Sequence, residues 1–188
     1  DFNGVKLLGK MMTKGDDNAL RHVAAFFAEK GIETMAVDAF LPDRKMPLGL
    51  VAGGEPDAQA TGAIALGVAI LAALGTHDVG QSVIVQNGRV IAIEAAEGSD
   101  AMIARATSLL DPTGGIACLV KMSKSAQDSR LDMPVIGCNT IKTAAKAGLL
   151  LLAVEADAVL LADDIAAIKA LCTAHGVTLI GIDSCTTS

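Results

Sequence analysis

Apolar residues recur along the chain at two spacings, one typical of helices and the other typical of strands. Helical spacing predicts helices over residues 17–30, 56–75, 99–110, 140–147 and 163–175. Short apolar runs predict strands over residues 32–37, 83–85, 90–93, 115–121, 149–154, 158–161 and 177–182. Residues 41–54 hold two prolines and three glycines without periodicity, which predicts a loop.

A tight turn is predicted between two of these strands. Asn87 and Gly88 separate the apolar runs 83–85 and 90–93, and Asn-Gly in this position is typical of an antiparallel hairpin. The other strands alternate with helices. We therefore expect an α/β domain built on a mixed sheet, with an antiparallel hairpin and flanking helices.

Composition supports a folded core and excludes one class of partner. Hydrophobic residues make up 52% of the 188 residues and charged residues 19%, which is the opposite of the balance in disordered chains. Aromatic residues make up only 2%, without Trp or Tyr, and the net charge is -6. A nucleic-acid site needs stacking platforms and positive charge, so we expect no nucleic-acid partner.

Cysteine spacing and the lengths of apolar runs indicate the compartment. Cys118, Cys138, Cys172 and Cys185 are far apart and match no zinc or disulfide framework, so we expect isolated thiols in a reducing compartment. The longest apolar run without a charge that we identify, residues 62–74, is too short to cross a bilayer. These features predict a cytoplasmic protein.

The first polar cluster, residues 94–100, lies between a predicted strand and a predicted helix. Glu97, Ser99 and Asp100 place carboxylates and a hydroxyl where free backbone N–H groups attract anions. Carboxylates at such a turn also suit Mg²⁺. The alternative is purely structural, with Ser99 capping the helix and Asp100 complementing its dipole.

The second polar cluster, residues 121–134, concentrates charge in a sparsely charged chain. Its cations are Lys121, Lys124 and Arg130, and its carboxylates are Asp128 and Asp132. Cations clamp phosphate oxygens, and neighbouring carboxylates bind a metal or orient water, so this mixture is typical of phosphoryl transfer. The alternative is a solvated loop whose opposite charges pair loosely.

Five segments occur in an order that resembles one known family. They are residues 15–20 (GDDNAL), 78–88 (DVGQSVIVQNG), 94–102 (EAAEGSDAM), 121–137 (KMSKSAQDSRLDMPVIG) and 154–156 (VEA). Together they resemble the LpxI family, the UDP-2,3-diacylglucosamine pyrophosphatases of lipid A biosynthesis in Gram-negative bacteria. Two departures are Ser125-Ala126 where the family has Pro-Gly, and Ser99 where it has Thr.

The resemblance implies two domains. Residues 1–55 resemble the tail and linker of a Rossmann-like N-terminal domain that is largely missing, and residues 56–188 resemble the C-terminal catalytic domain. If the missing part helps to hold the nucleotide, we expect this chain to be inactive alone.

The resemblance also implies a reaction and its residues. The expected reaction is Mg²⁺-dependent hydrolysis of UDP-2,3-diacylglucosamine to UMP and lipid X, with Mn²⁺ as an alternative ion. Catalytic roles are implied for Asp128, Asp132, Lys121, Lys124 and Arg130, and metal ligation for Asp100, Asp128 and Asp132. Substrate or phosphate contacts are implied for Gln81, Glu97, Gly98, Ser99 and Gln127.

The implied substrate predicts the partners as well. A lipid-linked sugar nucleotide would bring the protein into peripheral contact with the inner membrane, and a homodimer is a further expectation. The competing interpretation is a non-catalytic domain that binds lipids or sugar nucleotides, or serves assembly, in which the charged loop serves only recognition.

Overall fold

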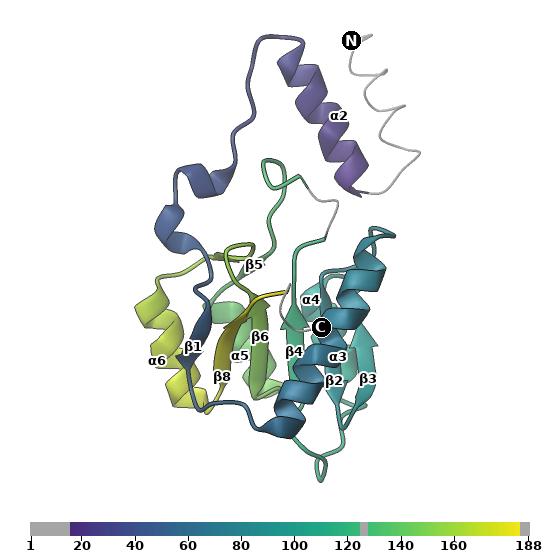
Figure 1. Cartoon of the computed structure of the whole chain (residues 1–188), viewed down its shortest axis with the longest axis vertical. Helices are drawn as coiled ribbons and strands as arrows, with labels where there is room; N and C mark the ends of the chain where they lie inside the picture. The colour runs from purple at the N-terminus through teal and green to yellow at the C-terminus, as the bar shows by residue number, and fades with distance from the viewer. Residues whose placement is uncertain (1–15, 125–127, 185–188) are drawn as a thin grey trace.

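A six-stranded mixed sheet forms the centre of the protein (Figure 1). The computed structural model describes residues 16–124 and 128–184, with side chains from residue 20 onward. The strand order is β1-β8-β6-β4-β2-β3; β4, β6 and β8 are parallel, and the other pairings are antiparallel. The strands are β1 (Gly49–Ala52), β2 (Ser82–Gln86), β3 (Arg89–Ile93), β4 (Cys118–Lys121), β6 (Leu151–Glu155) and β8 (Thr178–Ile182). The predicted α/β class with a mixed sheet and a hairpin is confirmed.

Helices cover both faces of this sheet. The α-helices are α2 (Asp16–Ala28), α3 (Ala58–Gly75), α4 (Ser99–Ala106), α5 (Cys138–Lys146) and α6 (Ile165–His175). Two 3₁₀ helices, η1 (Val37–Ala39) and η2 (Pro42–Arg44), lie in the segment that joins α2 to β1, and β5 (Val135–Ile136) pairs with β7 (Leu160–Leu161). In Figure 1, α3 crosses the front of the sheet, α4 and α5 lie behind it, and α2 stands apart at the top.

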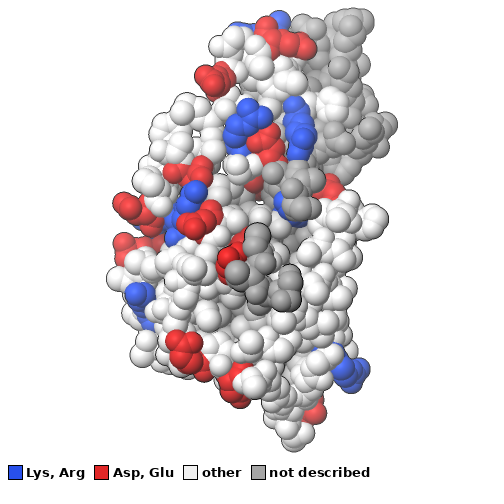
Figure 2. Space-filling model, in the orientation of Figure 1, with Lys and Arg blue, Asp and Glu red and all other residues white. Residues whose placement is uncertain are grey.

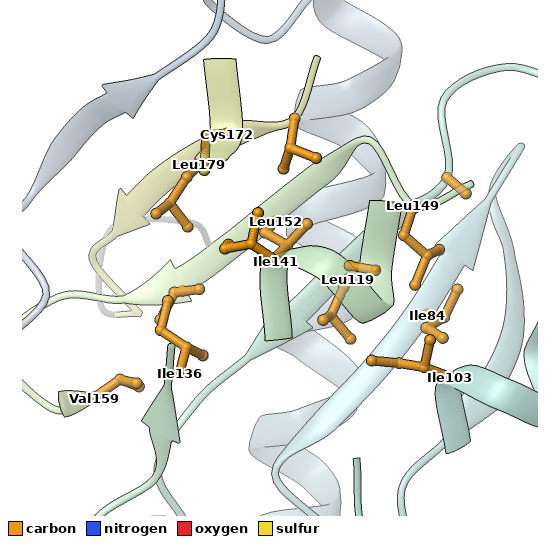
Figure 3. Packing of buried hydrophobic residues seen from close by; sticks show 14 of the residues in the cluster. Ile84, Ile103, Leu119, Ile136, Ile141, Leu149, Leu152, Val159, Cys172 and Leu179 are labelled. Atoms are coloured by element: carbon orange, nitrogen blue, oxygen red, sulfur yellow. The ribbon is translucent and has the colours of Figure 1, made fainter. Parts of the chain in front are cut away.

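Alternation along the strands divides the core into two layers. Val83, Val85 and Val120 pack under α3. Their neighbours Ile84 and Leu119 point to the other face, where they pack against α4 and α5 as Figure 3 shows. Successive strand side chains point to opposite faces, so each strand supplies both layers.

The helix α3 approaches the sheet closely and carries no charged residue. A Cβ atom on Gly67 would lie 2.4 Å from Cγ2 of Val120, so the glycine permits this contact. Among the described residues, α3 is one helix whose length and composition would suffice to cross a membrane, and it is longer than the run 62–74. Its buried side packs on the sheet instead, which is how the core helix of a globular domain packs.

Three sequence predictions near the start of the chain are wrong. Residues 32–37 form no strand but lead into the 3₁₀ turn η1. Residues 41–54 are more than a loop, because they include η2 and the edge strand β1, which pairs with β8. Pro56 is not the first helical residue, since Asp57 caps α3 by accepting a hydrogen bond from the N–H of Ala60 at 2.8 Å. The division at residues 55 and 56 stays a prediction.

The described cysteines are free thiols, as predicted. Cys118 and Cys172 are buried, and Cys138 is half-buried. Burial raises the pKa of Cys118 to about 12 and that of Cys172 to about 11. Cys185 lies outside the described residues.

We predict that Gly67→Ala destabilises the protein by about 2 kcal/mol, because the added methyl overlaps Val120. The matched control is Gly62→Ala in the same helix, where no atom lies within 4 Å of the added carbon. That substitution should stabilise the protein by about 0.5–1 kcal/mol through helix propensity. Urea unfolding of both variants checks the pair, and equal effects at the two positions would contradict the close contact.

We predict that Cys118 and Cys172 resist alkylation in the native protein at pH 8, where a raised pKa leaves almost no thiolate. Both should react rapidly once urea unfolds the chain. Peptide mass spectrometry after iodoacetamide labelling resolves each thiol separately. Fast native labelling of either residue would show that it is not buried as described.

Candidate active site

A buried lysine lies at the end of the central strand β4. Lys121 is 7% exposed, and burial lowers the pKa of its ammonium group. Its Nζ donates to Oγ of Ser99 at 3.0 Å and to Oγ of Ser82 at 3.5 Å. None of the ion pairs among the described residues includes Lys121. A buried ammonium whose direct partners are neutral hydroxyls attracts an anion.

The first turn of α4 supplies the hydroxyl beside this lysine. Gly98, with φ +82°, is the N-cap residue of α4, and no side chain caps this helix end. Ser99 therefore does not cap the helix, and its hydroxyl contacts Lys121 instead. This geometry favours the functional interpretation of residues 94–100 over the structural one. The uncapped N–H groups of α4 add to the positive potential around Lys121.

An open pocket of about 400 Å³ connects these groups. Its lining residues are Glu97, Gly98, Ser99, Asp100, Lys121, Val135, Asn139 and Thr140. The last two belong to α5, so two helices begin at this pocket. The first N–H of α5, on Cys138, already donates to the Asp163 carboxylate at 2.7 Å. The positive side of the pocket is therefore Lys121 and α4, while α5 contributes neutral polar side chains.

Three carboxylates surround the lysine at longer range. Glu94, Asp100 and Asp132 each oppose the effect of burial by favouring the charged form of Lys121, although burial remains the larger influence on its pKa. Asp100 and Asp132 are exposed, so both are open to solvent. An ammonium ringed by exposed carboxylates suits a ligand that combines phosphate groups with a divalent cation.

The remaining charged loop residues form pairs of their own. Arg130 holds Asp128 through two hydrogen bonds, Nε to Oδ1 at 3.0 Å and Nη2 to Oδ2 at 2.7 Å, which lower the pKa of that carboxyl to about 2. Lys124 forms an ion pair with Asp78 at 2.7 Å. None of these residues lines the pocket. The predicted cluster thus separates into Lys121 and Asp132 near the pocket and paired residues farther along the loop.

The other predicted binding residues have mixed positions. Glu97 lines the pocket, but hydrogen bonds from its own backbone and from Arg105 hold its pKa below the usual value. The backbone N–H of Gln81 donates to Glu94 at 3.4 Å, next to β2. Gln127 lies outside the described residues.

Charges are unevenly spread on the visible face of the protein. Figure 2 shows blue and red groups gathered around the linker and the loop beyond the upper ends of the strands, whereas the surface over α3 is white. Within residues 16–124 and 128–184, no three His, Cys, Asp or Glu side chains form a ready metal-binding group. Asp100 and Asp132 do fit the pair of carboxylates that Mg²⁺ combines with substrate phosphates.

Four residues near the pocket escaped the sequence analysis as site candidates. Ser82 and Glu94 are isolated polar residues in or beside apolar strands, and only strand pairing brings them next to Lys121. Asn139 and Thr140 begin a short helix, where polar residues usually serve as caps. The usable signal was the position of these two at a helix start just after a strand.

Comparisons with known proteins agree with these observations. The family model described as the LpxI C-terminal domain matches residues 47–180. The UDP-2,3-diacylglucosamine pyrophosphatase LpxI of Caulobacter vibrioides is 32% identical over 191 aligned residues, which cover 97% of this chain and 68% of the relative. With most of its length matched by both comparisons, and with the family's charged segments meeting at one pocket, this chain belongs to the LpxI family.

Proposed function

We propose that the protein hydrolyses the diphosphate of UDP-2,3-diacylglucosamine, which yields UMP and 2,3-diacylglucosamine 1-phosphate (lipid X) for lipid A biosynthesis. The activity in the name of its relative supports the substrate. The observation that carries the chemistry is the buried ammonium of Lys121, which lies between hydroxyls at the uncapped start of α4. Membership of this family favours an enzyme over a non-catalytic binding domain.

In this proposal, the chain's own groups stabilise the charge that develops during hydrolysis. The diphosphate binds with a phosphoryl group against Lys121 and the N–H groups of α4, and Ser99 contacts the same group. Negative charge on the phosphoryl oxygens increases as the bond to UMP breaks, and a fixed ammonium in a site of low polarity stabilises that charge. Water attacks the sugar-side phosphorus.

We further propose that Mg²⁺, or Mn²⁺ in its place, binds between the substrate and the exposed carboxylates. Asp100 and Asp132 would hold the ion, which when bound polarises the phosphoryl oxygens. Asp128 is fixed by Arg130, so we assign it to orienting water rather than to the metal. The ion pair between Lys124 and Asp78 would hold the loop that follows β4 against the end of α3.

The substrate also suggests where the protein works. Its two acyl chains would keep it in the inner membrane, so we propose a cytoplasmic protein in peripheral contact with that membrane. A homodimer stays a prediction.

We predict that Lys121→Met lowers kcat/KM for UDP-2,3-diacylglucosamine at least about 100-fold, since it removes a charge that stabilises the transition state. The free energy of unfolding should stay unchanged or rise, because a buried charge without an ion-pair partner is replaced by an apolar chain. The control is Lys169→Met, on the exposed side of α6. Near-normal turnover in the Lys121 variant, measured as UMP release, would exclude the proposed role.

We predict that EDTA abolishes UMP release and that added Mg²⁺ restores it. In ¹⁸O-labelled water, the label should appear in lipid X, as attack on the sugar-side phosphorus requires. Turnover that is insensitive to chelation would contradict the metal proposal, and label in UMP would contradict the site of attack.

The same assay separates the three aspartates. Asp100→Asn and Asp132→Asn should raise the Mg²⁺ concentration needed for half-maximal rate, whereas Asp128→Asn should lower kcat at saturating Mg²⁺. A reversed pattern would move the metal to Asp128. Silence of the folded chain, with a longer family member active beside it, would show that additional sequence is required for turnover.

A further inference from the structure

One buried hydroxyl beneath the pocket has no part in the proposed chemistry so far. Ser82 is completely buried at the start of β2, where Val83 and Val85 follow it in the core. In the pairing of β2 with β4, Ser82 lies directly opposite Lys121, so both side chains leave the sheet on the same face. An apolar residue would be the ordinary choice at such a position, because a buried hydroxyl must find polar partners.

The partners of Ser82 determine where its hydrogen points. Its Oγ lies 3.2 Å from Oγ of Ser99 and 3.5 Å from Nζ of Lys121. An ammonium group only donates hydrogen bonds, so Lys121 cannot accept the hydrogen of Ser82. Within this cluster, the acceptor for that hydrogen is therefore Oγ of Ser99.

The consequence falls on Ser99. Its oxygen accepts one hydrogen bond from Lys121 and one from Ser82, which occupies both lone pairs of the hydroxyl. Its own hydrogen must then point away from the cluster, and Ser99 lines the pocket. The hydroxyl thus becomes a fixed donor toward a bound ligand that offers acceptor oxygens.

We infer that Ser82 is a positioning residue that orients the Ser99 hydroxyl to donate a hydrogen bond to a phosphoryl oxygen of the substrate. This inference rests on the proposed function for the identity of the substrate. It assigns Ser82 no contact with the ligand. Its whole effect passes through Ser99, and this makes it separable from a merely structural role.

A double-mutant cycle tests this dependence. Wild type, Ser82→Ala, Ser99→Ala and the double variant are assayed for kcat/KM with UDP-2,3-diacylglucosamine at saturating Mg²⁺. We expect Ser82→Ala to lower kcat/KM about tenfold in the wild-type background, the order expected for the loss of one hydrogen bond. In the Ser99→Ala background, the same change should have no further effect, because the group that Ser82 orients is gone.

Controls keep the outcome unambiguous. Ser108→Ala removes an exposed hydroxyl on the turn after α4 and should leave kcat/KM unchanged. Ser82→Thr keeps the hydroxyl and should recover part of the loss. Thermal unfolding of each variant reports on folding. Equal losses from Ser82→Ala in both backgrounds, or no loss in the wild type, would overturn the inference.

The same four proteins distinguish this inference from the proposed function. If wild type does not hydrolyse the lipid substrate, the proposed function fails, and the cycle is repeated with the dissociation constant of inorganic pyrophosphate. Weaker pyrophosphate binding by Ser82→Ala only when Ser99 is present would support the hydrogen-bond order, whereas additive losses would refute it.

Discussion

The buried ammonium of Lys121 is the constraint on which the site depends. A lysine at the end of a core strand loses hydration, and the chain returns only two hydroxyls as direct partners. The remaining compensation comes from the start of α4 and from carboxylates at longer range. Such an arrangement is stable enough to fold but leaves a positive charge that an anionic ligand neutralises better than the protein does.

Two kinds of charge pairing therefore coexist within one loop region. Arg130 and Asp128 satisfy each other near the surface, and Lys124 does so with Asp78, so these residues shape the loop. Lys121 remains available because the sheet holds its stem while the loop turns away. The same sequence run thus provides both a scaffold of neutralised pairs and one reactive cation.

Local sequence signals predicted most of the fold. The hairpin followed from Asn87-Gly88, whose φ angles of 52° and 69° suit a two-residue turn, and the helices followed from apolar spacing. The edge strand β1 was missed because it is short, lies between glycines, and is defined only by pairing with β8, far along the chain. The site was found in part, since Lys121 and Ser99 stand in polar segments. Ser82 was not, because a lone serine before valines has no local signal and acquires its partners through strand register.

Strand register also determines how the hairpin tolerates change. The pairing of β2 with β4 is regular from Ser82 to Val85, while the pairing of β2 with β3 shifts between Ile84 and Val85. The irregularity is therefore taken up on the side away from Lys121. A hairpin tip can lengthen or shorten through that bulge while the catalytic edge keeps its alignment, whereas a slip of one residue against β4 would turn the Ser82 hydroxyl into the layer under α3. Natural insertions in this domain should accordingly gather at the β2–β3 tip and be absent from the β2–β4 ladder.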